Sequence, residues 1–104
     1  MISIEALREV LRYEPTTGDL IWRIHVSDKV RTGAKAGSRR KDGYIGIRVR
    51  GHRLLAHRAA WAIHNGCWPD GNIDHINGIP SDNRIANLRS VSQRTNIENQ
   101  RRAR

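Results

Sequence analysis

The residues of this sequence that are equipped for chemistry gather in its last third. Asp74 and His75 stand side by side, and Asn77-Gly78 follows them after one residue. Asn87 lies twelve residues past His75, and Asn96 lies nine residues further on. A carboxylate, an imidazole and two amides therefore share one segment of a strongly basic chain, which indicates chemistry on phosphate as well as binding.

The expected chemistry is hydrolysis of a phosphodiester, which needs an activated water, a cation that bears charge on the phosphate, and groups that hold both in line. The oxygens of Asp74 and Asn96 suit a hard divalent cation, Mg²⁺ or Mn²⁺. His75 is the expected general base because an imidazole exchanges protons near neutral pH. Asn87 can fix the ring by bonding one nitrogen while the other meets the water.

Each of these residues also has a simpler structural interpretation. Asp74 can form a turn, His75 can be a loop histidine, and Asn87 can cap its own backbone at the start of a strand. Asn96 can be an exposed helix residue. Adjacent residues of a regular strand face opposite sides. Asp74 and His75 therefore serve one site only if the strand ends there, and Asn77-Gly78 predicts such a break.

Composition narrows the choice of partner. The chain has 104 residues, which corresponds to one small domain. It contains 19 Lys and Arg against 10 Asp and Glu, a net charge of +9. This excess favours a polyanionic partner, nucleic acid, through electrostatic steering and counterion release. A basic face kept for solubility is the alternative.

Membrane insertion and secretion are not expected. No apolar run approaches the roughly 20 residues that span a membrane. The first residues, with Glu5 and Glu9, lack the apolar stretch of a signal peptide. Cys67 is the only cysteine, so no disulfide can form within the chain. The predicted location is the cytoplasm of a bacterial host cell.

The first third of the chain predicts a helix, a turn, a strand and a loop. Ser3 can cap a helix that begins at Ile4 and carries its apolar residues on one face. Residues 13–18 place Pro and Gly as in a turn, and residues 19–23 are expected to form a strand. Residues 27–42 are polar, basic and interrupted by Gly. They predict a loop that either lies along a phosphate backbone or is simply solvated.

The middle of the chain predicts a hairpin followed by a helix. Apolar residues alternate over residues 43–49 with the period of a half-buried strand. Arg50-Gly51 is the expected turn, and residues 52–56 are the partner strand. A helix is predicted over residues 57–64, ended by Asn65-Gly66 as a left-handed C-terminal cap.

The last third predicts strand, loop, strand and helix in that order. Residues 72–75 form the first strand, and residues 76–86 form a loop rich in Asn, Asp, Pro and Gly. Residues 87–91 form the second strand. Ser92 is the expected N-cap of a helix over residues 93–101. The fold class predicted for the chain is α+β, a small domain of short elements.

Residues 54–100 resemble the HNH endonucleases, most closely those of phage and mobile-intron origin, the homing type. The resemblance implies a ββα-metal module, a hairpin crossed by a helix around one divalent cation. It places that module at residues 52–104 and a DNA-contacting region at residues 1–51. The motifs that carry it are Ala56-His57-Arg58, Asp74-His75-Ile76-Asn77-Gly78, Asp82-Asn83-Arg84, Asn87-Leu88-Arg89 and Asn96-Ile97-Glu98-Asn99-Gln100.

The resemblance also implies a role for each polar residue of the site. Asp74 and Asn96 bind the metal, His75 is the general base and Asn87 orients His75. Many family members have His at the last ligand position, where this sequence has Asn96. Two oxygen ligands favour Mg²⁺ or Mn²⁺. The implied reaction cleaves DNA to leave a 3′-hydroxyl and a 5′-phosphate.

Basic residues supply the expected DNA contacts, each weighed against a surface or ion-pairing role. They are Lys35, Arg39, Arg40, Lys41, Arg48, Arg58, Arg84, Arg89, Arg101 and Arg102. His57 is expected to be structural, bonding the backbone under the motif. The sequence thus predicts a metal-dependent HNH DNA endonuclease that nicks DNA or cuts both strands, phage-encoded and of homing type, as a monomer or homodimer. A non-catalytic DNA- or RNA-binding module and a structural adaptor of a phage assembly are the alternatives.

Overall fold

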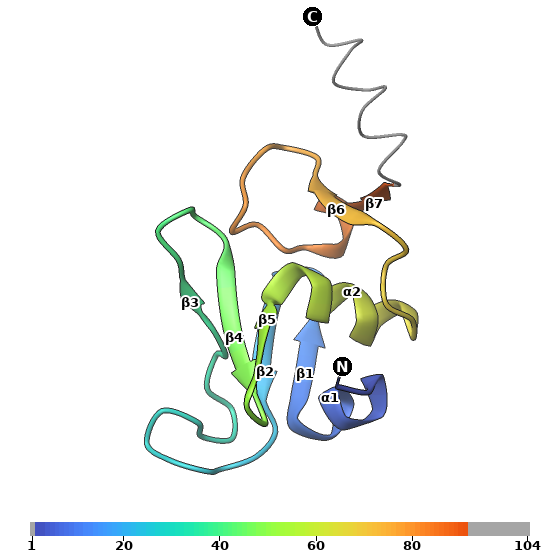
Figure 1. The fold of residues 1–104 in the computed structure, drawn as a ribbon. Coiled ribbons are helices and arrows are strands. Elements are labelled where there is room, and N and C mark those ends of the chain that lie inside the picture. Colours follow the sequence, from blue (N-terminus) through green and yellow to red (C-terminus); the bar gives the residue numbers. More distant parts are fainter. Residues whose placement is uncertain (1, 92–104) are drawn as a thin grey trace, which may run out of the picture.

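Three small antiparallel sheets are arranged around a central helix in the computed structural model, which describes residues 2–91 (Figure 1). The sheets have the strand orders β1-β2, β3-β4-β5 and β6-β7. Helix α2 contacts α1, β1, β4 and β5, so it lies where the sheets meet. The predicted α+β class of short elements is confirmed. The predicted last helix, with Asn96, Arg101 and Arg102, lies outside the described residues.

The N-terminal part is a helix that runs directly into a hairpin. Helix α1 spans Ile4–Val10, and the Ser3 side chain caps it by accepting a hydrogen bond from the Ala6 N–H at 3.1 Å. Strand β1 (Leu11–Glu14) pairs with β2 (Asp19–Trp22). The helix cap and the second strand agree with the sequence prediction. Strand β1 was missed, because its residues were divided between the helix and the turn.

The second sheet contains the predicted hairpin and one further short strand. Strands β4 (Ile45–Val49) and β5 (His52–Leu55) pair in register. Arg50 and Gly51 form the turn between them with φ of 49° and 82°. Strand β3 (Ser38–Arg39) adds to the edge of β4, so the predicted loop over residues 27–42 is partly ordered by the sheet.

The buried face of helix α2 is built mainly from alanine. It spans Ala56–Asn65, and four of its alanines are buried. Small side chains let the neighbouring strands approach the helix closely. Gly66 ends the helix in the left-handed region with φ 77°, and its N–H donates to the Ala62 carbonyl at 2.9 Å. The predicted C-terminal cap is confirmed.

The third sheet carries Asp74 and His75, two of the predicted chemical residues. Strands β6 (Asn72–His75) and β7 (Leu88–Val91) pair with Asp74 opposite Arg89. A short 3₁₀ helix, η1 (Ile85–Asn87), precedes β7. The order of strand, loop and strand agrees with the prediction, but Asn87 ends η1 and does not open the strand.

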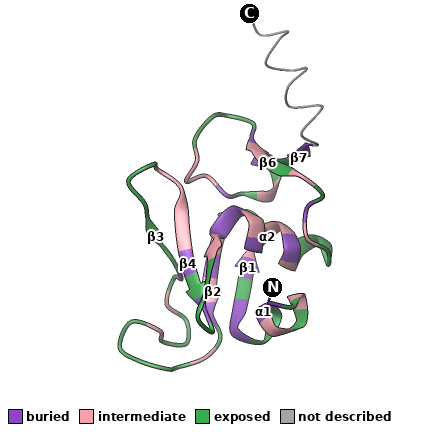
Figure 2. Cartoon of the chain, viewed as in Figure 1, coloured by how far each residue is buried: buried purple, intermediate pink, exposed green. Residues whose placement is uncertain are grey.

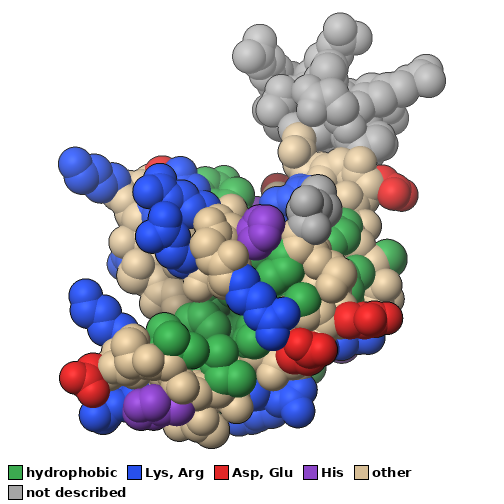
Figure 3. Space-filling view, turned by 60° about the horizontal axis from the view of Figure 1, so that its bottom comes forward, with side chains coloured by type: hydrophobic (Ala, Val, Ile, Leu, Met, Phe, Trp, Pro, Cys, Tyr) green, Lys and Arg blue, Asp and Glu red, His purple; other side chains and the backbone are tan. Residues whose placement is uncertain are grey.

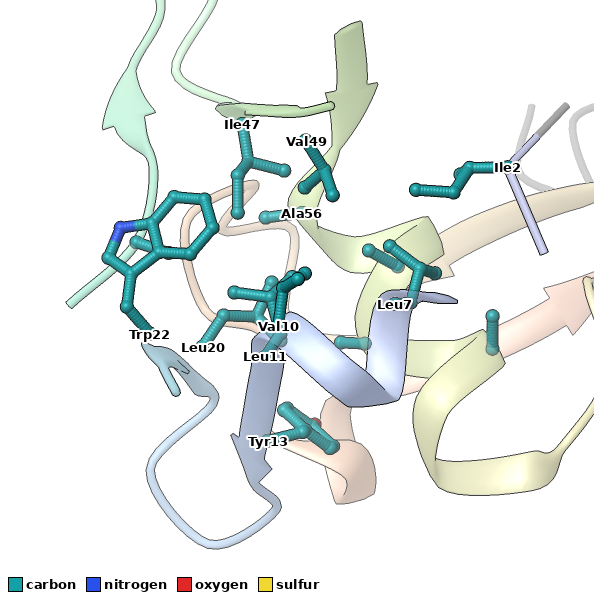
Figure 4. Close-up of a cluster of buried hydrophobic side chains, with 14 of the residues drawn as sticks. Ile2, Leu7, Val10, Leu11, Tyr13, Leu20, Trp22, Ile47, Val49 and Ala56 are labelled. Atoms are coloured by element: carbon teal, nitrogen blue, oxygen red, sulfur yellow. The ribbon is translucent and has the colours of Figure 1, made fainter. Parts of the chain in front are cut away.

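One apolar core joins the parts of the chain on both sides of residue 51. Burial is concentrated on α2, β1 and β2 (Figure 2). The buried cluster includes Leu7, Val10 and Leu11 from the N-terminal part, Val49 from β4 and the α2 alanines (Figure 4). The division of the chain at residue 51 stays a prediction, and the two regions share this core. No helix within residues 2–91 is long and apolar enough to cross a membrane.

The left-handed cap at the end of α2 gives a direct test of the fold. We expect Gly66→Ala to lower the free energy of unfolding by about 1 kcal/mol, because a Cβ disfavours positive φ. Gly66→Asn should lower it less, since Asn tolerates this conformation. Urea unfolding followed by circular dichroism measures both values. Equal stability of wild type and Gly66→Ala would contradict the cap.

Candidate active site

Asp74 and His75 face the same small cavity although they are neighbours on one strand. Strand β6 ends at His75, and the Gly78 N–H donates back to the His75 carbonyl at 2.8 Å in the turn that follows. Both side chains line a cavity of about 200 Å³, together with Asp42, Tyr44, Ile73, Gly78 and Pro80. The predicted break at the end of the strand thus lets both residues serve one site.

A larger cavity adjoins this one and shares Asp74 with it. Its volume is about 440 Å³, and it is lined by Arg40 and Arg58 as well as by His57. Asp42, Tyr44, Ile73 and Asp74 line both cavities. The Asp74 carboxylate therefore stands between a hollow that contains the imidazole of His75 and one bordered by arginines.

The ring of His75 is held by Asn83. His75 Nε2 lies 2.9 Å from Asn83 Oδ1, and the two residues are 8% and 3% exposed. An amide oxygen can only accept a hydrogen bond, so His75 Nε2 carries the hydrogen and donates the hydrogen bond to Asn83 Oδ1. His75 Nδ1 then carries the lone pair. This is the tautomer that a general base with a free Nδ1 requires.

The predicted contact between Asn87 and the His75 ring was wrong. Asn87 Oδ1 accepts a hydrogen bond from the Asn77 N–H at 2.9 Å. Asn87 Nδ2 donates to Asn77 Oδ1 at 2.9 Å and to the Asp82 carbonyl at 2.8 Å. These bonds close the loop between β6 and β7. Asn87 ends η1 with its amide committed to this loop, whereas Asn83 lies against the imidazole.

Two further rings pack around His75. The ring centroids of His57 and His75 are 4.9 Å apart, and the Tyr44 ring lies 5.4 Å from His57 and 5.7 Å from His75. His57 is 5% exposed, and its Nδ1 is buried without a hydrogen-bond partner among the described residues. Burial lowers the pKa of His57 to about 4, and the charges of His75 and Arg58 act in the same direction. A neutral His57 therefore supports the His75 imidazole through packing, and its Nδ1 does not make the predicted bond to the backbone.

Asp74 has the character of a ligand for a hard cation. Its side chain is 42% exposed, and Oδ2 accepts a hydrogen bond from Arg89 Nη2 at 2.5 Å across the hairpin. Carboxylate oxygens are the ligands that hard divalent cations prefer, and at Asp74 such an ion would share the carboxylate with the Arg89 guanidinium. No three His, Cys, Asp or Glu within residues 2–91 form a group that could hold a metal. The second predicted ligand, Asn96, lies outside the described residues.

Arg58 and Arg84, two of the predicted DNA contacts, already form hydrogen bonds within the protein. Arg58 Nη1 donates to the Gly71 carbonyl at 2.8 Å. Arg84 donates through Nε and Nη2 to the two carboxylate oxygens of Asp82 at 2.8 and 2.7 Å. These bonds lower the pKa of Asp82. Arg58 lines the larger cavity, and Arg89 bonds to Asp74, so these side chains also hold the loop and strands around the site.

The predicted DNA contacts between residues 35 and 48 lie on the surface. Lys35 and Arg40 form ion pairs with Asp19 and Asp42 at 3.6 and 3.0 Å. Exposed pairs of this kind contribute little to stability and exchange readily for other anions. Arg39, Lys41 and Arg48 are also exposed. Figure 3 shows Lys and Arg side chains gathered at several places on one face of the molecule.

Comparison with known families identifies the class to which this site belongs. Residues 54–97 match the model of an HNH endonuclease family. The range begins in β5, includes α2, β6 and β7, and contains Asp74, His75, Asn83 and Asn87. This part of the chain therefore matches an HNH endonuclease family, and the resemblance predicted from its motifs is confirmed.

A solved structure extends the likeness over the N-terminal part. The chain is similar to the HNH homing endonuclease I-HmuI, with a TM-score of 0.66 and 28% sequence identity. The match covers 98% of this chain and 57% of that chain. That structure is titled as DNA binding and cleavage by the enzyme. Comparison with curated proteins gave no significant match.

The buried His57 makes stability depend on pH. The unfolded chain protonates this histidine near its ordinary pKa of 6.5, whereas the folded chain does so only near pH 4. Proton uptake therefore favours unfolding as the pH falls below about 6.5. We expect about 2 kcal/mol of unfolding free energy to be lost through His57 between pH 8 and pH 5.

Urea unfolding at several pH values measures this effect. His57→Gln should be less stable at pH 8 but should lose less stability on acidification than wild type. His25→Gln, at an exposed histidine, is the control and should keep the wild-type dependence. An unchanged pH dependence in His57→Gln would show that another group is responsible.

Proposed function

We propose that this protein is a divalent-metal-dependent DNA endonuclease in which His75 is the general base. The observation that carries the proposal is the shared cavity: a buried imidazole with a defined tautomer opens onto the hollow that is lined by the Asp74 carboxylate. The HNH domain match and the likeness to a homing endonuclease support DNA as the substrate. The excess positive charge of the chain supports the same partner.

The chain's own residues divide the work of hydrolysis. Asn83 keeps the proton on His75 Nε2, so Nδ1 can take a proton from the water that attacks the phosphorus. The water's oxygen forms the new bond to phosphorus as the bond to the leaving 3′-oxygen breaks, which leaves a 5′-phosphate. His57 and Tyr44 limit the motion of the base by packing against its ring.

The metal site is proposed on Asp74, with Asn96 as the second protein ligand. A bound Mg²⁺ or Mn²⁺ would neutralise charge on the scissile phosphate and stabilise the leaving oxygen. Both proposed ligands offer oxygen, which suits a hard cation. Arg89 holds the Asp74 carboxylate in place from the opposite strand.

DNA is proposed to lie along the arginine-bordered cavity next to Asp74. Arg40 and Arg58 line this cavity, Arg89 is bonded to Asp74, and the exposed Lys41 and Arg48 extend the positive surface onto the β3-β4-β5 sheet. Arg84 is proposed to contact phosphate from the loop that precedes β7. Phosphate contacts of this kind set position and affinity without reading the base sequence. We further propose a phage-encoded enzyme of homing type that works in the bacterial cytoplasm.

Removal of the base is the first test of the proposed reaction. We expect His75→Ala to reduce cleavage of supercoiled plasmid by about 10²–10⁴-fold. The variant should still fold, as judged by circular dichroism, and should still bind DNA in a gel-shift assay. The ratio of open-circle to linear product reports whether one strand or both are cut. Normal cleavage by His75→Ala would refute the assignment of the base.

Removal of the metal ligand is the second test. We expect Asp74→Asn to weaken Mn²⁺ binding by at least about 10-fold, measured by calorimetry, and to abolish plasmid cleavage. Asp42→Asn is the matched control because Asp42 lines the same two cavities and pairs with Arg40. It should bind Mn²⁺ as wild type does. Cleavage that persists in a chelator would argue against metal dependence, and binding without cleavage would favour a non-catalytic module.

A further inference from the structure

We propose that residues 13–18 of the N-terminal hairpin, the end of β1 and the turn that follows it, are a positioning element for the catalytic imidazole and act through Asn83. The inference rests on the proposed role of His75 as the general base. It assigns a function to residues that lie outside the HNH domain match and far from it in sequence. None of them touches the reacting atoms, so they are positioning residues.

The first contact that supports this proposal is a buried hydrogen bond. The Tyr13 hydroxyl donates to the Asn83 carbonyl at 2.5 Å, across 70 residues of sequence. Tyr13 is 8% exposed, and the edge of its ring packs against His64 on α2. Burial, with a contribution from the charge of Asp82, raises the pKa of Tyr13 to about 12. The hydroxyl therefore remains protonated and able to donate at neutral pH.

The second set of contacts lies between the turn of the hairpin and the backbone of residues 83–85. The Ile85 N–H donates to the Pro15 carbonyl at 3.0 Å. A Cβ on Gly18 would lie 2.5 Å from the Asn83 carbonyl carbon and 2.6 Å from the Arg84 nitrogen. Only a glycine allows so close an approach of two backbones. The hairpin therefore fixes residues 83–85 at three consecutive positions.

Asn83 joins this docked backbone to the active imidazole. Its carbonyl is held by Tyr13, and its side-chain oxygen accepts the proton of His75 Nε2 at 2.9 Å. The other side of the loop is held by Asn87, which donates to the Asp82 carbonyl. A shift of the Asn83 backbone would carry its amide away from the ring. His75 would then lose the partner that selects its tautomer and its orientation.

Loss of these hairpin contacts should lower the rate of the chemical step and leave DNA binding unchanged. Displacement of a catalytic group by about 1 Å can reduce the rate as much as 10²-fold, even when the change lies outside the reacting centre. DNA affinity depends on basic side chains, whereas the Tyr13 hydroxyl bonds to the backbone carbonyl of Asn83. Loss of the Tyr13 hydroxyl should therefore lower kcat about 10-fold and leave KM for DNA unchanged.

The test compares Tyr13→Phe with a variant of similar stability. Tyr13→Phe keeps the aromatic ring and removes only the donor to Asn83. Gly66→Ala is the control, since it strains the cap of α2 and its added Cβ would have Arg8 Nη2, at 3.6 Å, as its neighbour. Plasmid cleavage measures kcat and KM. Nitrogen-15 NMR of the His75 ring, at one fixed pH, reports how far the Nε2-protonated tautomer is favoured.

We expect Tyr13→Phe to lower kcat and to weaken the preference for the Nε2-protonated tautomer, while Gly66→Ala changes neither. A merely structural role for Tyr13 predicts that both variants lose stability and that neither alters the ring signals. Unchanged ring signals and unchanged kcat in folded Tyr13→Phe would overturn the inference.

A second pair of variants keeps the inference testable if Tyr13→Phe does not fold. Gly18→Ala would push the backbone of residues 83 and 84, whereas Gly51→Ala adds the same Cβ at a similar φ with nothing within 4 Å. Only Gly18→Ala should disturb the His75 ring signals. The NMR measurement does not need cleavage. Failure of the proposed function, an inactive wild type, is thus distinguished from failure of the inference, an undisturbed ring.

Discussion

The hydrogen bond from His75 Nε2 to Asn83 Oδ1 is the contact on which the site depends. It is buried, so water does not compete for either partner, and it selects one of two tautomers that an isolated imidazole would populate. The hairpin and the loop around the site keep the two partners of this hydrogen bond together. The β6–β7 hairpin sets the position of His75, and the loop closed by Asn77, Asp82 and Asn87 returns Asn83 to the ring.

The excess of positive charge is used in two ways. Next to the site, arginines are tied to defined acceptors: Arg84 to Asp82, Arg89 to Asp74, and Arg58 to the Gly71 carbonyl. Short, charge-assisted bonds of this kind fix geometry. Elsewhere Lys and Arg side chains remain exposed on the surface, where they can steer a polyanion toward the cavities. Arginine thus holds the loop and strands next to the site, and on the rest of the surface it is available to bind a partner.

Local patterns in the sequence predicted the elements whose cause is local. The Ser3 cap, the Gly66 terminator and the β4–β5 hairpin each follow from residues within a few positions of one another. Strand β1 escaped prediction because its apolar Leu11 continues the spacing of α1. These residues form a strand because they pair with β2, and the local sequence pattern does not show that pairing. The predicted bond from Asn87 to the imidazole was wrong because the loop contains several amides, and the sequence does not show which of them meets the ring.

By itself the sequence determined the chemistry available to this protein: a carboxylate and an imidazole at the end of one strand, in a basic chain with an HNH motif set. These features depend on residue identity and short spacing, which a sequence displays directly. Only the tertiary structure decided that Asn83 holds the His75 imidazole and that Tyr13, 70 residues away, holds Asn83. The physical reason is that hydrogen bonds of a folded loop depend on where its backbone is docked, and that docking is made by a distant hairpin.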